Sequence, residues 1–371
     1  MDADFARVPG AVLDDGVLSH LGNPFAEQRA LVLGEAVAPL GDRRVLAVTG
    51  EDRLSWLDSL SSQALAGLLP GESTELLVLD PQGRVEHAAA VVDDAQTTWL
   101  IVDAGDADAL LGWLVRMRFR LRVAPRDASD DLRVVGVADA GLALVAPAAP
   151  AGVPLVWHDP WPGVRAGGFA YGAVEGHPGL DRRWNEVLVA PAELDRIVAA
   201  ATRGEVALAG VLASEALRIG AWRPRWANEV DERTIPHELD WLRTAVHLQK
   251  GCYRGQETVA KVHNLGHPPR RLAALHLDGS DDVLPSPGDV VRAGEAEVGR
   301  VTSVARHYED GPIALAVVKR TTPDDAVVRV ETSGAAVAAT LQTIVPADAG
   351  ATADIPRLPR LGRRPSATSA S

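Results

Sequence analysis

The chain is poor in two residue types, cysteine and lysine. One cysteine, Cys252, among 371 residues excludes an intramolecular disulfide framework and favours a reducing compartment. Three lysines, Lys250, Lys261 and Lys319, stand against 34 arginines. Two of these lysines bracket the cysteine. Because arginine is used almost everywhere else, a lysine pair beside a lone thiol points to a functional segment.

Long apolar runs are also missing. No stretch of about 18 apolar residues exists, so no membrane span is expected. The first residues, 1–7, lack the basic and apolar regions of a secretory signal. A formal net charge of −13 argues against broad binding to a nucleic-acid backbone. We therefore expect a cytoplasmic protein with neither a membrane nor a direct nucleic-acid partner.

One stretch departs from the acidic balance. It carries five closely spaced arginines: Arg116, Arg118, Arg120, Arg122 and Arg126. They form either a local basic patch or the solvent-facing side of a helix end and a strand. The alternate spacing around Phe119 and Leu121 favours the second interpretation, because runs of charge are usually solvated faces.

The first third of the chain predicts a compact module. Strands are expected at 45–48, 74–79, 85–92, 97–102 and 121–123, with helices at 52–60 and 106–117. Residues 80–83 form the turn of a hairpin. This order indicates helices on one face of a largely antiparallel sheet, which is an α+β module.

A looser second copy follows. We expect strands at 133–137, 142–145, 164–171 and 187–189, and helices at 191–201 and 206–219. Residues 239–246 fit an apolar helical stripe that places Trp241 in the core. Two such modules would bury their apolar helix faces against each other.

The C-terminal region reads as a small all-β domain of short strands separated by Gly, Pro and Asp turns. The predicted divisions are an N-terminal segment 1–40, a first α+β module 41–130, and a second module 131–267. A C-terminal β-barrel, 268–345, and a disordered tail, 346–371, complete the chain.

Cys252 lies in Lys250-Gly251-Cys252-Tyr253-Arg254-Gly255-Gln256-Glu257. Gly251 and Gly255 suggest a tight loop that a ligand can approach, and an ammonium near a thiol favours the reactive thiolate. The other possibility is an inert buried cysteine. The charged flanking residues favour an accessible thiol. Its chemistry stays open between a redox or persulfide function, a transient metal or cluster contact, and a one-carbon adduct.

Several motifs together resemble a known family. They are Ala216-Leu217-Arg218-Ile219-Gly220, Asn228-Glu229-Val230-Asp231, Thr234-Ile235-Pro236-His237-Glu238, the Cys252 octapeptide, the Gly83 turn, and Pro269-Arg270-Arg271-Leu272. Over about residues 40–330 the chain resembles the YgfZ family of folate-binding proteins, relatives of the glycine-cleavage T-protein, an aminomethyltransferase.

The resemblance implies a three-part ring, with two α+β lobes and a C-terminal β-barrel around a hole the size of tetrahydrofolate. It implies a reduced folate as ligand and cofactor. It also implies a role in assembling or repairing iron–sulfur proteins, with such proteins or assembly factors as partners, and through them in tRNA modification.

A reduced folate needs an aromatic wall and a carboxylate for its pterin, and a cation for its anionic tail. We expect these folate-binding residues: Arg218, Trp222, Glu229, Lys250, Gly251, Tyr253, Gly255, Gln256 and Glu257. Cys252 and Lys250 are the expected catalytic pair at the rim of the pocket. Trp222 lies beside Pro224 in a loop, where it lines the pocket or packs in the core.

A metal site is not expected. His263 and His267 are four residues apart and could join Cys252 in a zinc or iron site. Gly266 and Pro268 flank His267, however, so a helix presenting both imidazoles is doubtful. A single cysteine does not hold a four-thiolate cluster.

A sharper enzymatic alternative is a T-protein-type aminomethyltransferase or demethylase. In that relative, aspartates follow the glycine turn, whereas this chain has Glu86 and His87 there. Either could act as an acid or base. Alternation along a strand places them on opposite faces, so at most one is expected to point into the site. A third alternative is an interaction protein with an incidental thiol.

Overall fold

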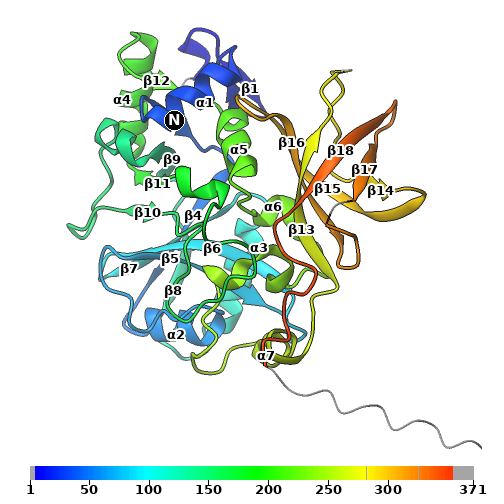
Figure 1. Ribbon diagram of the computed structural model, residues 1–371. Coiled ribbons are helices and arrows are strands. Elements are labelled where there is room, and N and C mark those ends of the chain that lie inside the picture. The colour runs from blue at the N-terminus through cyan, green and yellow to red at the C-terminus, as the bar shows by residue number, and fades with distance from the viewer. Residues whose placement is uncertain (1–4, 281, 325, 354–371) are drawn as a thin grey trace, which may run out of the picture.

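The computed structural model describes residues 5–280, 282–324 and 326–353. These residues form two five-stranded sheets packed face to face and a closed barrel beside them (Figure 1). The expected α+β class, with mainly antiparallel sheets and a C-terminal barrel, is confirmed.

The first sheet is wholly antiparallel. Its strand order is β5 (Ser73–Leu79), β6 (Val85–Asp93), β7 (Thr97–Asp103), β4 (Arg43–Thr49) and β8 (Ala124–Asp127). Helices α2 (Arg53–Leu60) and α3 (Ala107–Met117) supply Trp56 and Trp113 to a core on one face of this sheet. The predicted hairpin and both predicted helices are present, and the last strand lies three residues later than predicted.

Alternation along β6 separates two environments. Ala89 and Val91 are buried in the core with α2 and α3, whereas Ala88 and Ala90 are partly buried on the opposite face. Only the second half of β6 has a neighbour on its β7 side, because β7 pairs with residues 90–93. The edge of β6 over residues 85–89 is therefore open for other groups to approach.

The second sheet has the strand order β10 (Val156–His158), β11 (Trp184–Val189), β9 (Arg133–Ala138), β3 (Ala36–Pro39) and β12 (Ala207–Leu208). Strand β12 is parallel to β3, and the other pairs are antiparallel. Helix α4 (Pro191–Thr202) packs on one face. The other face shares a core with the first sheet. Residues 36–39, expected in a separate N-terminal segment, are thus part of this sheet.

The N-terminal region adds several short elements to the second sheet's end of the molecule. They are η1 (Phe5–Arg7), β1 (Val12–Asp14), β2 (Val17–His20) and α1 (Pro24–Leu33). Glu27 of α1 accepts hydrogen bonds from the backbone N–H groups of Leu21 and Gly210, which tie this region to the start of α5 (Val211–Gly220).

Three element predictions in the second module are wrong. Residues 164–171 form a loop whose N–H groups bond to the carbonyls of Leu242 and Arg243, because Gly167 and Gly168 interrupt any ladder. Residues 142–144 belong to the 3-10 turn η2 (Asp139–Leu144), and Val145 follows it. The helix predicted over 206–219 is divided into β12 and α5, since Gly210 packs directly against the backbone of Ser19.

The segment between α5 and the barrel is mostly turns. It contains α6 (Trp226–Glu229), η4 (Pro236–Leu239), η5 (Trp241–Arg243) and α7 (Gln256–Leu265). The turn η3 (Pro178–Asp181), which precedes β11 in the chain, packs against Ala221 at the end of α5. The apolar stripe at 239–246 is therefore not a continuous helix, because Asp240 has a left-handed backbone with φ of 57°. Trp241 is buried, as predicted.

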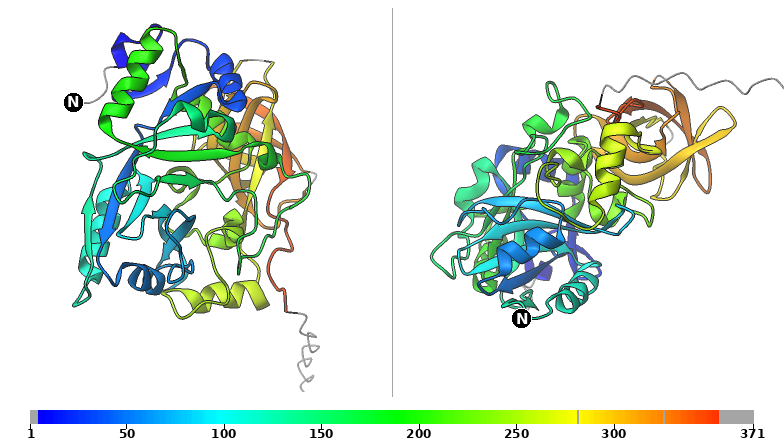
Figure 2. Two further views of the ribbon diagram at one scale, coloured as in Figure 1. Left: turned by 90° about the vertical axis from the view of Figure 1, so that its left-hand side faces the viewer. Right: turned by 90° about the horizontal axis from the view of Figure 1, so that it is seen from below.

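The barrel closes in the order β13 (Arg270–Leu277), β16 (Gly311–Lys319), β15 (Ala296–His307), β14 (Val290–Ala293), β17 (Val327–Glu331) and β18 (Ala336–Thr343). Valine, leucine and alanine side chains fill its interior. A separate core joins β13 and β16 to β5, β6 and the 239–259 segment. The three parts meet there, as the views in Figure 2 also show.

The start of the predicted tail is ordered. Residues 346–353 pack against the end of α7, where Ala349 O is 2.8 Å from His267 Nδ1 and Thr352 N donates to His263 O. Residues 354–371 of that prediction lie outside the described residues.

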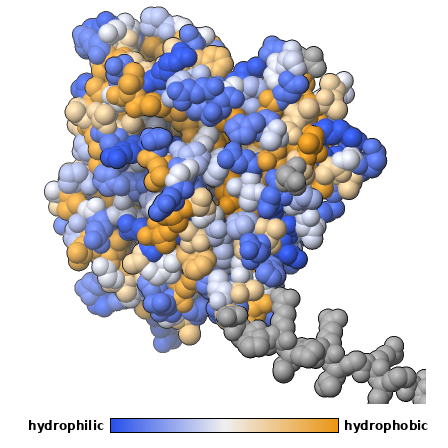
Figure 3. Space-filling model, viewed as in Figure 1, coloured by the Kyte–Doolittle hydropathy of each residue, from blue (hydrophilic) through white to orange (hydrophobic). Residues whose placement is uncertain are grey.

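The face in Figure 3 mixes hydrophilic and scattered hydrophobic residues, with a notch between the sheets and the barrel. No helix among the described residues is long and apolar enough to cross a membrane.

Candidate central cavity and adjoining groove

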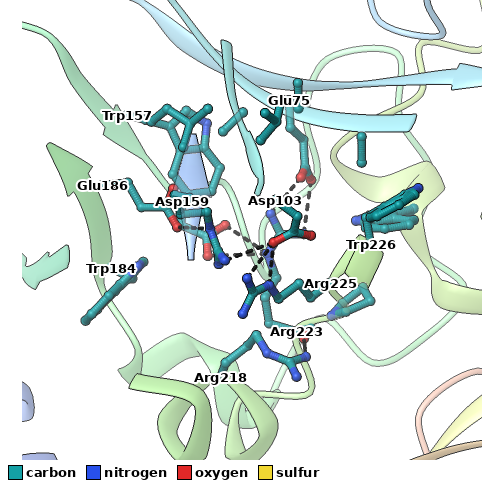
Figure 4. Close-up of a pocket in the computed structure, with 18 of the residues that line it drawn as sticks. Glu75, Asp103, Trp157, Asp159, Trp184, Glu186, Arg218, Arg223, Arg225 and Trp226 are labelled. Carbon is teal, nitrogen blue, oxygen red and sulfur yellow. Dashed lines mark hydrogen bonds and ion pairs between the residues drawn. The ribbon is translucent and has the colours of Figure 1, made fainter. Parts of the chain in front are cut away.

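Three arginines enter the space between the two sheets and the barrel. Arg218 lies in the last turn of α5, and Arg223 and Arg225 follow in the loop before α6. Trp222 takes a left-handed backbone with φ of 58°, which turns the chain sharply at this point. In Figure 4 these arginines converge with carboxylates from both sheets.

Arg223 joins the two sheets. Its guanidinium lies 2.6 Å from a carboxylate oxygen of Glu75 on β5 and 3.2 Å from Asp159, which follows β10. The same guanidinium lies over the rings of Trp157 and Trp161, at 5.9 and 5.5 Å from their centroids. Because all these groups are buried, removing one partner would leave an uncompensated charge.

Arg225 and Arg43 share a carboxylate at the end of β7. Asp103 lies 2.6 Å from the Arg225 guanidinium and 2.9 Å from that of Arg43. Arg225 also contacts Asp42 at 2.7 Å and Glu215 at 3.1 Å. These pairs connect the start of β4 and the end of β7 to the loop after α5.

Arg218 and Glu229, both predicted to bind the ligand, lie close together in the structure, but each uses its charge to pair with the other. They form a 3.1 Å ion pair, and Glu229 also accepts hydrogen bonds from Arg225 N and the hydroxyls of Thr302 and Ser303. Both hydroxyls belong to β15. This pair therefore fastens the barrel to the lobes, and burial raises the pKa of the Glu229 carboxyl despite Arg218.

The whole network is unbalanced in charge. It contains the guanidinium groups of Arg43, Arg182, Arg218, Arg223 and Arg225 and the carboxyl groups of Asp42, Glu75, Asp103, Asp159, Glu186, Glu215 and Glu229. There are thus two more carboxyls than guanidiniums. Asp42 and Glu215 are partly exposed, at 27% and 23%, so the five buried carboxyls balance the five guanidiniums in number. The buried carboxyls differ in how well each is compensated by its neighbours.

Among the carboxyls of this network, Glu186 has the most acceptor sites left free for a hydrogen bond. It lies on β11 with a side chain only 9% exposed, and its nearest cation, Arg43, is 3.6 Å away. In the part of the chain that the structure describes, its carboxylate accepts no hydrogen bond. Burial raises its pKa, against the opposing effect of Arg43. Glu186 is therefore the acceptor most available to a ligand.

A cavity of about 90 Å³ lies at the centre of the network. Its wall includes Ala88–Ala90 of β6, Trp157, Trp184, Glu186, Trp226 and Trp241. The volume is several times what one water molecule needs but does not enclose a whole folate. It is smaller than the hole implied by the resemblance, because the arginine side chains occupy much of the space.

A larger groove of about 770 Å³ adjoins this cavity. Its wall includes Val85–His87 of β6, the exposed face of α3, and the segment Val230–Glu232. Trp226 lines both spaces, and its indole N–H donates to the carbonyl of Glu86 at 2.9 Å. The cavity and the groove thus lie along successive stretches of one strand.

Both Glu86 and His87 line the groove, whereas one of them was expected to face the site. The reason is that the groove follows the open edge of β6, which exposes both sides of the strand. Neither lines the central cavity. Glu86 pairs with Arg254 at 2.7 Å, and His87 Nδ1 lies 2.6 Å from Asp106.

Cys252 is exposed, as expected of an accessible thiol. Its loop packs on the Gly83 turn. A Cβ on Gly255, whose φ is 84°, would lie 2.6 Å from Asp80 O and 2.9 Å from Gly83 Cα. Cys252 and Gly251 do not line the central cavity or the groove. The geometry thus places the thiol on the surface of the loop that supports the groove, away from the cavity wall.

Lys250 is held by backbone carbonyls. Its ammonium donates to the carbonyl oxygens of Asp58, Ser61 and Gln63, the last two at 2.9 and 2.6 Å. The side chain is 3% exposed and lies over the ring of Tyr253. Burial lowers its pKa, and Asp58 opposes this effect. All three N–H donors are therefore used in joining the Cys252 loop to the chain after α2.

The other predicted ligand residues are dispersed. Tyr253 is buried in the core where the three parts meet, and burial raises its pKa. Trp222 packs edge-on against His177 at 5.1 Å between ring centroids. Gln256 donates to Lys250 O, and Glu257 is exposed on α7. None of these four lines the cavity or the groove.

The sequence reasoning missed most of the cavity's charged residues. Glu75 and Glu186 are single carboxylates within fully buried, largely apolar strands, STELLVL and WNEVLV. A charge in a fully buried strand needs a partner, so this pattern was the available signal. Asp103 and Asp159 follow strand ends and offered no comparable signal.

The histidines considered for a metal have other contacts. His263 Nδ1 lies 2.8 Å from the Tyr171 hydroxyl, and His267 Nδ1 lies 2.8 Å from Ala349 O. Across the described ranges, no group of three or more His, Cys, Asp or Glu side chains is placed to hold a metal ion.

Comparison with known proteins agrees with this architecture. Residues 270–347 match the family model of the glycine cleavage T-protein C-terminal barrel domain. The chain also superposes on the glycine cleavage system aminomethyltransferase T from Bartonella henselae with a TM-score of 0.69. That match has 18% identity and covers 90% of this chain and 93% of the other, and it shows a shared fold.

Two curated relatives extend the likeness in sequence. An aminomethyltransferase of Synechococcus elongatus is 28% identical over 259 residues, 67% of each chain. An aminomethyltransferase of Synechococcus sp. strain RCC307 is 27% identical over 307 residues, 79% of this chain and 82% of the relative. The family-model match is confined to the barrel, and the superposition shows that the described chain shares the T-protein fold.

Replacing Lys250 tests whether it supports the loop or acts on a ligand. Lys250→Met removes three buried hydrogen-bond donors, so we expect a loss of roughly 2 kcal/mol in unfolding free energy. Faster hydrogen exchange over residues 58–63 should accompany it. Lys261→Met, at an exposed lysine of α7, is the matched control and should change neither. Unchanged stability of Lys250→Met would contradict the structural role.

The raised pKa of Glu186 predicts that ionisation of this carboxyl destabilises the folded protein as pH rises. Stability linked to such a group is present below its unfolded-state pKa and is lost as pH rises through the folded-state pKa. Glu186→Gln removes this loss, so its melting temperature should exceed that of the parent by about 2–4 °C at pH 8, with a smaller difference at pH 5. Thermal scans across this range measure the effect, with exposed Glu257→Gln as control. A melting temperature below the parent's at pH 8 would contradict the prediction.

Proposed function

We propose that the protein binds a reduced folate, with the pterin in the central cavity. The observation that carries this proposal is the buried Glu186 carboxyl on the cavity wall beside Trp184, which accepts no hydrogen bond within the described residues. A pterin offers a row of N–H donors and a flat ring, which suit a carboxylate and indole walls. The T-protein fold and the aminomethyltransferase relatives support the same ligand class.

We further propose an accessory role of the YgfZ type, in which Cys252 supports the assembly or repair of iron–sulfur proteins and, through them, tRNA modification. The exposed thiol supports this role because a partner protein can reach it. The folate and the thiol then occupy different surfaces. The turn at Gly83, beside the groove, is in direct contact with the Cys252 loop. A change in the conformation of the turn can therefore alter the conformation of the loop.

A second candidate is a folate-dependent aminomethyltransferase or demethylase. The names of the curated relatives favour it, and so does the place of Glu86 beside the cavity. The ion pair between Glu86 and Arg254 at 2.7 Å opposes it, because Arg254 already occupies a carboxylate oxygen that would have to contact the substrate. Formation of 5,10-methylene-tetrahydrofolate from an aminomethyl donor by the purified protein would establish this activity.

Calorimetry with tetrahydrofolate and 5-formyl-tetrahydrofolate tests the ligand directly. We expect the parent protein to bind at least one of them and Glu186→Gln to bind at least tenfold more weakly, since a charge-assisted contact to the ring is lost. Glu257→Gln serves as the charge-matched control. Absence of binding by both folates would refute the assignment of the cavity.

The thiol role is tested in cells that lack the protein. Cys252→Ala should retain folate binding, because the side chain does not line the cavity, but should fail to support iron–sulfur enzyme activity. Gly251→Ala, at the preceding exposed position with no atom within 4 Å of the added carbon, is the control and should support it fully. Full activity of Cys252→Ala would remove the thiol from the function.

A further inference from the structure

We infer that the turn after α3 and the exposed side of α2 form a docking surface for the protein partner of Cys252, and that this partner presents carboxylates around an apolar socket. The inference rests on the proposed accessory function and deepens it, because it names the surface that holds the partner while the partner reaches the thiol. The centre of the surface is the Phe119 patch, which consists of Val115, Arg118, Phe119, Arg120 and Leu121.

Phe119 is placed where the fold gains little from a large side chain. It is 78% exposed and directly follows Arg118, the C-cap of α3, with a left-handed backbone of φ 47°. Helices that end in this way usually have glycine at that position, because a side chain is strained there. Val115 and Leu121 are about half exposed beside it. Contact with another molecule would remove this apolar surface from water.

The arginines of the turn differ in whether they are engaged. Arg122 pairs with both Glu51 and Asp52. Arg118 and Arg120 are exposed, and within the described residues their guanidinium groups form no hydrogen bond or ion pair. The carboxylates that contact this turn are thus taken up by Arg122. The two free guanidiniums form a local positive charge on a chain whose net charge is −13, and they select an acidic partner surface.

Helix α2 connects the patch to the loop that carries Cys252. Near its start, the indole N–H of Trp56 donates to the carbonyl of Met117 at 3.1 Å, which holds the turn after α3. Just past its end, the ammonium of Lys250 donates to the carbonyl of Ser61 at 2.9 Å. The eight residues of α2 span about 12 Å at 1.5 Å per residue. The patch and the thiol loop therefore adjoin opposite ends of one short helix.

One partner can cover both features. A standard protein–protein interface buries about 800 Å² on each side, which corresponds to a surface roughly 30 Å across. Helices α2 and α7, the second of which follows the Cys252 loop, lie at the same end of the molecule in Figures 1 and 2. Between the patch and the loop, α2 exposes Ser55 and Ser59, small side chains that let a partner approach closely.

The composition of the patch favours a protein over other anionic partners. Aromatic and arginine side chains are the residues that most often dominate protein–protein binding. A nucleic acid would contact the arginines and stack on Phe119, but Val115 and Leu121 would gain nothing from phosphates or bases. A membrane surface would leave the polar side of α2 without a matching apolar layer.

Two patch variants test the surface in cells that lack the protein. Phe119→Gly should melt no lower than the parent, because glycine favours the left-handed backbone. It should nevertheless reduce the support of iron–sulfur enzyme activity about fivefold, the effect of losing one dominant interface side chain. Arg118→Glu/Arg120→Glu should lose at least as much, because an acidic partner is then repelled.

Phe25→Ala and Arg183→Glu are the matched controls. Both residues are exposed far from the patch in sequence, and within the described residues the Arg183 guanidinium has no partner. Both controls should support full activity. The rate at which N-ethylmaleimide labels Cys252 should be the same in all variants, which shows that the thiol itself is unchanged. Full cellular activity of both patch variants, or an equal loss in the controls, would overturn the docking surface.

Cys252→Ala in the same cells separates this inference from the function on which it rests. If Cys252→Ala supports full activity, the accessory function fails and the docking surface fails with it. If Cys252→Ala is inactive and the patch variants are fully active, only the docking surface fails. Binding of the purified parent to phosphatidylglycerol vesicles or to transfer RNA that is lost in Phe119→Gly would assign the patch to a membrane or a nucleic acid, and would overturn a protein partner.

Discussion

The structure depends on a buried network of arginines and carboxylates at the point where its three parts meet. Arg223 holds the first sheet to the second through Glu75 and Asp159, and Arg218 holds the barrel through Glu229 and Ser303. Such networks are expensive to desolvate, so they contribute specificity of arrangement more than stability. Here they hold the lobes together and leave a small cavity whose wall carries the weakly compensated Glu186 carboxyl.

The Glu186 carboxyl connects the architecture with the choice of ligand. A protein that needed only stability would pair each buried carboxyl with a cation or replace it with an apolar group. Glu186 instead keeps free acceptors on the cavity wall, and its raised pKa records the cost. A ligand with N–H donors would compensate the charge on binding.

Much of the fold was readable from the sequence, because apolar alternation in 74–79 and 85–92 and the helix 106–117 follow directly from local periodicity. The site was less readable. Cys252, Lys250 and the glycines were recognised as a motif, yet their contacts show a supporting loop: Lys250 bonds carbonyls and Gly255 packs on the Gly83 turn. The charges that shape the cavity come from six separate segments, and only long-range packing brings them together.

The most direct test of the account is a crystal structure of the protein soaked with tetrahydrofolate. The account predicts density for the pterin between Trp184 and Trp226, with its N–H donors within hydrogen-bond distance of the Glu186 carboxylate. A pterin bound elsewhere, or a Glu186 carboxylate that remains without a hydrogen bond in the occupied protein, would contradict it.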